Sequence, residues 1–469
     1  MTPNLMTECV HAILIGAGQR GEEAFAPYAV QNPHRLRFVA VAEPDPTRRA
    51  AFADQHQIPP ENRFESWEPL LAKPAMGTAA LVCTQDRAHT APALAALQAG
   101  YHVLLEKPMA PTAGECRALV DQAARCGRQL HVAHVLRYTK HFQRIRDVLR
   151  SGVLGEIVNV SHRENVSWWH MAHSYVRGNW ANSAQSTPMI LAKCCHDFDI
   201  LIWMLARQCR RLSSFGSLAH FRPDKAPPGV PDYCLDGCPV QDTCPYYAPF
   251  IYVDLLPLWR SFAATAASLP ALLARAQERA PGLVKMLSYM APPLRQAVDY
   301  GGWPRSVVAQ PATPENLLEA LKKGPYGRCV YRCDNDAVDN QVVAMQFDGD
   351  LSVTLTMQGH SHIEGRTTRI EGSRGSLKAH FGVGGAWIEV NEHRSDCRMA
   401  YDTSAALGEG HGGGDQALLA SFLDSVSGDG KGALSLAEQA LESHLLAFAA
   451  ETARLEGRVV DMEGFRLTC

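Results

Sequence analysis

The sequence predicts a two-domain α/β protein, with a doubly wound parallel sheet followed by an α+β domain. Over roughly the first 134 residues, short apolar runs alternate with helical patterns, which is typical of a parallel sheet covered by helices on both faces. Alternating apolar and polar residues return after Asp339 and indicate antiparallel strands. With 469 residues, the chain is also longer than one hydrophobic core usually serves.

The composition excludes several classes of protein. Apolar residues make up 46% and charged residues 20% of the chain, as in globular proteins in water. A net charge of −3 predicts no nucleic-acid or membrane-surface partner. No targeting segment is evident, and prolines and polar residues interrupt the longest apolar run, 261–274. We therefore expect a cytoplasmic protein whose 14 cysteines are mostly reduced thiols.

The first predicted strand leads directly into a glycine motif. The apolar run Ala12–Ile15 precedes Gly16, Gly18 and Gly21 at G-x-G-x-x-G spacing. This spacing permits a tight strand-to-helix turn, close approach of the backbone to a pyrophosphate, and close packing of the helix on the strand. N–H groups at the start of the following helix, where Gln19 and Arg20 lie, would bind the phosphates. The motif predicts a Rossmann-type dinucleotide-binding domain over residues 1–134.

An acidic residue follows the second predicted strand, Leu36–Ala42. Glu43 lies about 20 residues after the last glycine, where an acid is expected to bind a ribose 2′-hydroxyl. It favours NAD, because a carboxylate repels a 2′-phosphate. NADP stays open, since Arg48 and Arg49 are close by.

Two further cofactor contacts are expected where the third strand ends. Ligands of an open α/β sheet lie beyond the carboxyl ends of its strands, and Thr84 directly follows the strand at 79–83. His89 opens the next helical pattern, so a helix-start role and a cofactor contact are both open for it. The other strands of this sheet are predicted at 102–106 and 129–134, with helices at 46–57, 89–99 and 113–126.

The strand Val103–Leu105 ends in Glu106-Lys107-Pro108. Together with the glycine motif, this tripeptide resembles the glucose–fructose oxidoreductase / inositol dehydrogenase (Gfo/Idh/MocA) family, closely over the N-terminal third and loosely beyond it. The resemblance implies that Lys107 lies beside the nicotinamide and the substrate hydroxyl, that Glu106 is a further cofactor contact, and that the Lys107–Pro108 bond is unusual, often cis. A partly desolvated lysine at a strand end can also share a proton with a substrate oxygen.

The resemblance implies that residues 135–469 form an α+β domain with an open, mostly antiparallel sheet that faces the nicotinamide. Its strands are predicted at Ile157–His162, Gln341–Phe347, Leu351–Gln358, Arg366–Glu371, Ser376–His380 and Ala386–Val390. The family commonly pairs subunits through this sheet, so we expect a homo-oligomer, either a dimer or a tetramer.

Residues 168–180 gather four aromatic residues, two histidines and an arginine. Tryptophan faces stack on the C–H surfaces of sugars, while His and Arg donate hydrogen bonds to hydroxyls or a carboxylate. A helix-packing loop is the alternative for this segment, and a helix start capped by Asp415 is the alternative for His411. The candidate substrate ligands are Arg137, Trp169, His170, His173, Arg177, Trp180 and His411.

The stretch Ile190–Trp203 is predicted to form one helix with an apolar face. The resemblance implies that His196 acts as the base toward the reacting hydroxyl, and Asp199, three residues on, could fix its tautomer. A buried core histidine is the alternative. The family has an aspartate four residues before this histidine, whereas this chain has Ala192 there. Lys193 is therefore a further catalytic candidate that could contact a substrate oxygen or carboxylate.

Residues 222–330 are predicted to be an insertion with two or three amphipathic helices, which form a cap or a subunit contact. Five cysteines lie near its two ends, and four of them could hold a structural zinc ion. An iron–sulfur cluster and unmetalled thiols are the alternatives. The candidate metal ligands are Cys234, Cys238, Cys244, Cys329 and Cys333.

These observations predict an NAD(P)-dependent oxidoreductase that acts on a hydroxyl of a small sugar, cyclitol or sugar derivative. The alternative is an NAD-dependent glycoside hydrolase that oxidises the sugar transiently, eliminates the aglycone and reduces the product back. A nucleotide-binding sensor without catalysis is a third reading, which the presence of both Lys107 and His196 disfavours.

Overall fold

A computed structural model describes residues 9–264, 269–288, 295, 299–404, 411–428 and 437–468. Its N-terminal part is a six-stranded sheet in the order β3-β2-β1-β4-β5-β6, in which all neighbouring strands are parallel. The strands are β1 (Val10–Ile15), β2 (Leu36–Ala42), β3 (Arg63–Phe64), β4 (Ala79–Val82), β5 (His102–Leu105) and β6 (Leu130–Val132). The predicted doubly wound sheet is confirmed.

Apolar side chains bury both faces of this sheet. Ala12–Ile15 of β1 and Ala79–Val82 of β4 are almost fully buried, because helices pack on the sheet from both sides. These helices are a π-helical turn (Arg20–Phe25), α1 (Ala26–Gln31), α2 (Pro46–Gln55), α3 (Trp67–Leu71), α4 (Thr90–Gln98) and α5 (Ala113–Cys126). The carboxyl ends of the strands therefore form one edge that is available to a ligand.

The second sheet has nine strands in the order β14-β13-β12-β11-β7-β10-β9-β8-β15. Among the described strands of this second sheet, only β7 and β10 pair in parallel. This confirms the mostly antiparallel sheet. The strands are β7 (Ile157–Ser167), β8 (Cys209–Ser217), β9 (Asn340–Phe347), β10 (Ser352–Ser361), β11 (Gly365–Gly372), β12 (Gly375–Gly382), β13 (Gly385–Glu392), β14 (Arg398–Asp402) and β15 (Val460–Asp461).

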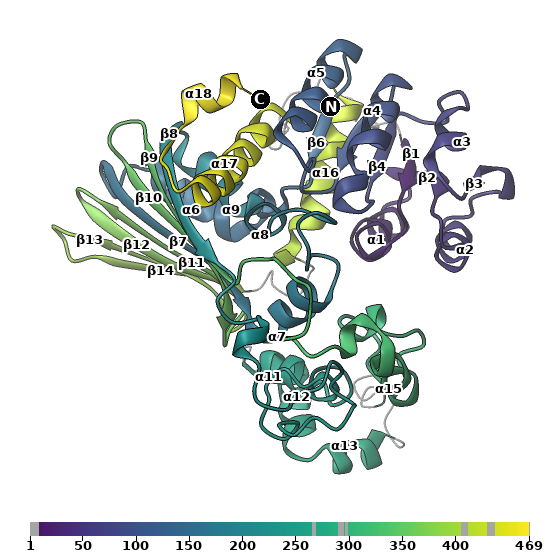
Figure 1. The fold of residues 1–469 in the computed structure, drawn as a ribbon. Coiled ribbons are helices and arrows are strands. Elements are labelled where there is room, and N and C mark those ends of the chain that lie inside the picture. Colours follow the sequence, from purple (N-terminus) through teal and green to yellow (C-terminus); the bar gives the residue numbers. More distant parts are fainter. Residues whose placement is uncertain are drawn as a thin grey trace.

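Helices gather on one side of this sheet, between it and the N-terminal part (Figure 1). Side chains alternate accordingly: Val353, Leu355 and Met357 of β10 are buried, whereas those between them are only partly covered. The helices outside the insertion are α6 (Lys140–Arg150), α7 (Trp168–His170), α8 (Met189–Ala192), α9 (Cys195–Leu205), α16 (Gly414–Ser427), α17 (Ala437–Glu456) and α18 (Met462–Leu467).

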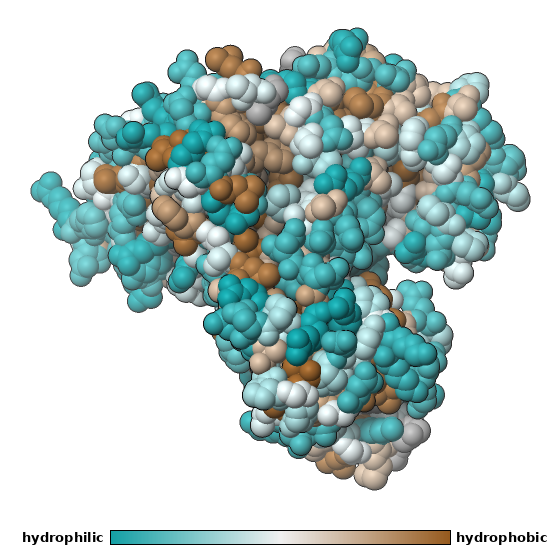
Figure 2. Space-filling view, in the orientation of Figure 1, coloured by the Kyte–Doolittle hydropathy of each residue, from teal (hydrophilic) through white to brown (hydrophobic). Residues whose placement is uncertain are grey.

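The segment between β8 and β9 forms a separate lobe below the two sheets (Figure 1). The lobe has its own apolar cluster, which includes Tyr252, Leu258 and Trp259 and also takes in Trp169 from α7. Its helices are α10 (Ala248–Tyr252), α11 (Leu256–Ala264), α12 (Leu269–Arg279), α13 (Pro281–Ser288) and α15 (Pro314–Lys323). The surface is hollowed between this lobe and the N-terminal part (Figure 2).

No helix in the described ranges is both long enough and apolar enough to cross a bilayer.

Candidate functional site

The glycine loop has the geometry that a dinucleotide requires. Gly16 has a φ of +95°, and a Cβ there would lie 2.7 Å from the carbonyl oxygen of Cys83. A Cβ on Gly21 would lie 2.4 Å from the carbonyl oxygen of Gly16, so both positions need glycine for packing. A Cβ on Gly18, by contrast, would meet no atom within 4 Å. The space beside Gly18 is therefore open to a pyrophosphate.

Glu43 lies directly beside this loop. Its carboxylate accepts a hydrogen bond from the N–H of Ala17 at 2.8 Å and pairs with Arg48 at 2.9 Å. The side chain is buried, whereas that of Arg48 is about half exposed. An acid next to the glycine loop fits the ribose of a dinucleotide, and the arginine beside it keeps NADP compatible with the site.

Arg20 connects three parts of the chain at the edge formed by the carboxyl ends of the first sheet's strands, which we call the cofactor edge. Its guanidinium donates to Glu106 at 2.7 Å, at the end of β5, and to Asp415 at 2.6 Å, at the start of α16. The neighbouring Gln19 is exposed. The predicted cofactor contacts Arg20 and Glu106 thus bind each other, and they position the loop that carries Gly18.

Thr84 and His89 make contacts within the protein. The hydroxyl of Thr84 donates to the carbonyl of Ala88 at 2.9 Å, and Thr84 remains partly exposed. His89 is buried, and its two ring nitrogens lie 2.6 Å from the carbonyl oxygen of Pro108 and 3.0 Å from that of Thr84. This arrangement favours a structural role for His89, which ties the end of β4 to the segment after β5.

Lys107 links the first sheet to helix α8 of the second domain at the predicted reaction centre. The Lys107–Pro108 peptide is cis, as the resemblance implied. The ammonium group of Lys107 donates to the carbonyl of Ala192 at 3.1 Å. Ala192 ends α8, so a side chain from the cofactor edge of the first sheet reaches the second domain at this point.

The prediction of a single helix over Ile190–Trp203 is wrong, because the helix is interrupted at Lys193 and Cys194, between α8 and α9. The carbonyl of Ala192 binds Lys107 there, and a side chain that takes a helix carbonyl favours an end of the helix. Lys193 therefore lies between the two helices, whereas His196 lies in the first turn of α9.

His196 and Asp199 belong to a buried polar cluster on α9. The ring of His196 packs edge-on against that of His134, with ring centroids 5.5 Å apart, and His196 is 7% exposed. Arg137 donates to both carboxylate oxygens of Asp199, at 2.6 and 2.5 Å, and His134 Nε2 lies 3.7 Å from the same carboxylate. Asp199 and His196 thus both contact His134, and the predicted substrate ligand Arg137 is buried in the same cluster.

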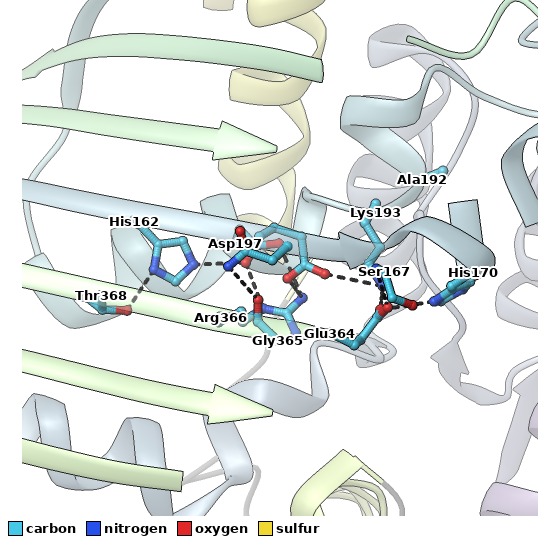
Figure 3. A network of polar contacts seen from close by, with 12 residues as sticks. His162, Ser167, His170, Ala192, Lys193, Asp197, Glu364, Gly365, Arg366 and Thr368 are labelled. Atoms are coloured by element: carbon cyan, nitrogen blue, oxygen red, sulfur yellow. Dashed lines mark hydrogen bonds and ion pairs between the residues drawn. The ribbon is translucent and has the colours of Figure 1, made fainter. Parts of the chain in front are cut away.

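Lys193 is held between two carboxylates (Figure 3). Its ammonium nitrogen lies 3.2 Å from Oε1 of Glu164 and 3.2 Å from Oε1 of Glu364. Glu364 also accepts from the backbone N–H of Ser167 at 2.7 Å and contacts Nδ1 of His170 at 2.9 Å. Burial opposes ionisation of Glu364, but His170 and Lys193 outweigh it and hold its pKa well below the usual range. Glu364 is therefore a carboxylate at neutral pH.

A second group of charged side chains, which includes Asp197 and Arg366, lies next to the Lys193 group (Figure 3). Arg366 pairs with Glu164 at 2.9 Å and with Asp197 at 2.7 Å, and Asp197 also contacts His162 at 2.9 Å. Burial would raise the pKa of Asp197, but Arg366 and His162 lower it to about 2. Glu164, Asp197 and His162 are almost fully enclosed, whereas Arg366, Lys193, His170 and Glu364 are 13, 17, 20 and 26% exposed.

Sequence reasoning missed Glu164, Glu364 and Arg366. A signal was present for Glu164, because it lies in phase with the buried residues Val160 and Val166 of β7. A charged residue at such a position needs a buried partner. Glu364 lies in the turn between β10 and β11, and no pattern in the sequence brings that turn to Lys193.

Three of the predicted substrate ligands are buried where the lobe joins the second domain. Trp169 packs in the apolar cluster of the lobe. His173 binds the hydroxyl of Tyr252 at 3.0 Å, and Arg177 donates to the carbonyls of Arg328 and Tyr246, each at 2.7 Å. These contacts favour a structural role, in which the 168–180 segment anchors the insertion.

The other predicted ligands divide differently. His170 is partly exposed beside Glu364. Trp180 is also partly exposed and donates its indole N–H to Asp86 at 3.0 Å, close to the cofactor edge. The side chain of His411 lies outside the described residues.

The predicted zinc site is not supported. In the part of the chain that the structure describes, no three His, Cys, Asp or Glu side chains are grouped so that they could hold a metal ion. Cys234, Cys238, Cys244 and Cys329 do line one small cavity. The thiol of Cys333 donates to the carbonyl of Cys329.

The comparisons with known proteins agree with this geometry. A family model described as "Oxidoreductase family, NAD-binding Rossmann fold" (GFO_IDH_MocA) matches residues 10–134. D-glucoside 3-dehydrogenase of Escherichia coli is 32% identical over 149 residues, which are 31% of this chain and 40% of that protein. Inositol 2-dehydrogenase of Serratia proteamaculans is 32% identical over 137 residues, 29% of this chain and 37% of that protein. The chain thus spans about 40% of the length of these curated relatives.

The fold similarity extends over the whole chain. An oxidoreductase from Agrobacterium radiobacter, solved in complex with NAD+, L-tartaric acid and magnesium, aligns over 97% of this chain and 99% of its own, with a TM-score of 0.64 and 14% sequence identity. At this identity the alignment shows a shared fold. Residues 10–134 thus match the NAD-binding part of the Gfo/Idh/MocA oxidoreductase family, and the chain as a whole shares the fold of a solved oxidoreductase.

Proposed function

We propose that this chain is an NAD(P)-dependent oxidoreductase that acts on a hydroxyl of a sugar, cyclitol or sugar derivative. The observation that carries the proposal is the reach of Lys107 from the end of β5 to the carbonyl of Ala192, four residues before His196. This contact joins the cofactor edge of the first sheet to the helix pair that holds a histidine. A general acid–base pair at such a junction suits hydride transfer from a carbon that bears a hydroxyl.

The residues around the glycine loop fit a nicotinamide dinucleotide. Gly18 leaves room for the pyrophosphate, and Glu43 lies where the adenosine ribose would bind. Once bound, the cofactor would supply the hydride acceptor or donor. Glu43 favours NAD over NADP, because its carboxylate would repel the 2′-phosphate of NADP. We therefore propose NAD as the working cofactor.

The protein's own groups would handle the proton and the oxygen. In this proposal the ammonium group of Lys107 binds the reacting oxygen, and the imidazole of His196 accepts the hydroxyl proton. Burial, together with the charges of Arg137 and Lys107, lowers the pKa of His134 well below its usual value. His134 is therefore neutral beside His196 and adds no like charge when His196 takes up a proton.

Two named relatives support the substrate class. One is a D-glucoside 3-dehydrogenase and another an inositol 2-dehydrogenase, and both names denote oxidation of a ring hydroxyl. No observation favours the glycosidase alternative. The two reactions also differ in outcome, because the oxidoreductase forms NADH in proportion to product whereas the redox-neutral glycosidase releases aglycone without net NADH.

The variant Lys107→Met tests the proposal. We expect turnover to fall by about 10²–10⁴-fold, because general acid–base catalysis contributes that much. NADH affinity, measured by quenching of protein fluorescence, should change little, since the pyrophosphate and ribose contacts remain. Lys140→Met, at the start of α6, is the matched control. Turnover equal to wild type in Lys107→Met would contradict the assigned role.

A further inference from the structure

The partly exposed polar group beside the predicted reaction centre has a composition that indicates its ligand. Lys193 follows Ala192, whose carbonyl binds Lys107, so this group lies next to the proposed site of proton transfer. Lys193, His170 and Glu364 are the accessible members of the network in Figure 3. A substrate that reaches Lys107 would therefore pass close to these three side chains.

The charge balance around Lys193 disfavours an anionic substrate. Its ammonium group already lies 3.2 Å from each of two carboxylates. Arg366, the next cation of the network, is likewise already paired with two protein carboxylates, Glu164 and Asp197. A substrate carboxylate would have to displace a carboxylate that the protein supplies, and it would be repelled by the others.

Glu364 keeps one acceptor position. A carboxylate offers about four lone-pair sites to hydrogen-bond donors. Within the described part of the chain, three donors reach it: Lys193 and His170 at Oε1, and the N–H of Ser167 at Oε2. One site on Oε2 of this partly exposed side chain therefore remains for a donor from a ligand, and a hydroxyl is such a donor.

The insertion supplies an apolar wall on the other side of His170. The ring of Trp303 stands edge-on to that of His170, with centroids 5.0 Å apart. An apolar ring close to a carboxylate is a common arrangement for binding the C–H face and the hydroxyls of a sugar.

We propose that Glu364 is a specificity-determining residue: its carboxylate, oriented by Lys193, His170 and the N–H of Ser167, accepts a hydrogen bond from a hydroxyl of a neutral sugar or cyclitol and disfavours sugar acids. This inference rests on the proposed oxidoreductase function. It gives Lys193 a positioning role, since its charge is used to hold Glu364.

The test compares neutral and acidic probes with the full-length protein and NAD. Methyl β-D-glucoside and myo-inositol serve as neutral probes, and D-glucuronate serves as the acid. We expect wild type to reduce NAD with at least one neutral probe at a kcat/KM about tenfold or more above that for glucuronate. In Glu364→Gln, KM for the neutral probe should rise roughly 10- to 100-fold, as for loss of a hydrogen bond to a charged group. Its kcat should change by less than about threefold.

Three further measurements make the result decisive. Glu364→Asp should recover part of the lost affinity, because it restores the carboxylate. Glu319→Gln, an exposed acid on α15, should behave as wild type. The melting temperature and NADH affinity of each variant show whether it folds; if Glu364→Gln does not fold, Glu364→Asp alone tests the role of the carboxylate position.

The outcomes separate the two proposals. Preference of wild type for glucuronate, or an unchanged KM in Glu364→Gln, would overturn the role of Glu364 while leaving the oxidoreductase in place. Failure of wild type to bind NADH, or to reduce NAD with any neutral or acidic sugar, would instead reject the proposed function itself.

Discussion

Substitutions of two glycines in the first loop should affect different properties, the stability of the fold at Gly16 and the affinity for NADH at Gly18. Gly16→Ala should lower the free energy of unfolding by about 1–2 kcal/mol or more, because φ is +95° and the new methyl group would lie 2.7 Å from a carbonyl oxygen. Gly18→Ala should fold normally, since nothing lies within 4 Å of its Cβ. Its NADH affinity should fall by about tenfold or more, because the methyl group would occupy the space for the pyrophosphate.

Urea unfolding and NADH titration of both variants check this prediction. Wild-type NADH affinity in Gly18→Ala would show that the pyrophosphate does not pass beside Gly18. The comparison with Gly16→Ala matters, because loss of binding there follows from a disturbed loop and would not locate the cofactor.

Asp197 gives the fold a dependence on acidic pH. Its pKa is lowered from 3.8 to about 2, because Arg366 and His162 outweigh the effect of burial. Since the folded pKa lies below the unfolded one, the carboxylate stabilises the fold above about pH 4, and this contribution is lost as pH falls toward 2. A shift of this size corresponds to about 2 kcal/mol.

The variant Asp197→Asn isolates this contribution. It should be less stable than wild type at neutral pH, and the difference between the two should shrink by about 2 kcal/mol between about pH 5 and pH 2. Denaturant unfolding at a series of pH values measures it. A constant difference over that range would mean that the pKa of Asp197 is not lowered by folding.

At this scale the sequence revealed the residues of the cofactor edge better than those of the substrate side. Gly18, Glu43 and Lys107 belong to a local motif, in which spacing along one strand and one turn determines position in space. Lys193 and Glu364 meet only because two distant segments pack together. That contact depends on the register in which β10 and β11 each pair with β7, and a single sequence does not specify this register.

Among the elements, the segment after β7 holds the insertion in place through Arg177. This buried side chain donates to the carbonyls of Tyr246 and Arg328, near the start and the end of the insertion. Arg177→Met should therefore loosen the lobe, because both carbonyls lose a charged donor. We expect limited proteolysis to cleave between residues 222 and 330 at least tenfold faster than in wild type.

NADH binding provides the internal control for Arg177→Met. The glycine loop belongs to the other sheet, so NADH affinity should stay within about twofold of wild type. Equal proteolysis of the two proteins would show that the apolar cluster around Tyr252 and Trp259 holds the lobe without help from Arg177.

Strand and helix prediction succeeded where periodicity was long and failed where it was short. The alternation at 341–347 and 351–358 corresponds to β9 and β10. The strands β3 and β15 contain only two residues each, which are too few to show a periodic pattern. Strand β8 was missed because its exposed and buried residues do not alternate strictly. The break after α8 could not be predicted either, since the Ala192 carbonyl at this break binds a lysine from the other domain.

At the scale of the whole molecule, the sequence predicted the order of the parts but not their arrangement. The glycine motif and the returning strands specified two different sheets, and both are present. The insertion was expected as a cap or a subunit contact. Its helices form a lobe with its own apolar cluster, and its role as a cap or a subunit contact stays a prediction. Only contacts between distant segments determine where such a lobe docks.

The uncovered face of the second sheet carries exposed apolar side chains in one row across the strands. Phe215 of β8 pairs with Val342 of β9, and Trp387 of β13 lies in the same row through the paired residues of β12, β11, β7 and β10. Phe215, Val342 and Trp387 are 73, 41 and 45% exposed. Exposed apolar residues on one sheet face are typical of an interface with another protein surface.

We therefore predict that this face pairs two copies of the chain. Phe215→Glu should convert a dimer or tetramer into a smaller species and raise the apparent dissociation constant by about tenfold or more, because a charge would be buried without a partner. Leu467→Glu, at a position that is 83% exposed on α18, should leave the assembly unchanged. Light scattering with size-exclusion chromatography measures the mass of each variant. A wild-type protein that is monomeric at micromolar concentration would contradict the pairing, whereas an assembly that survives Phe215→Glu would place the contact on another face.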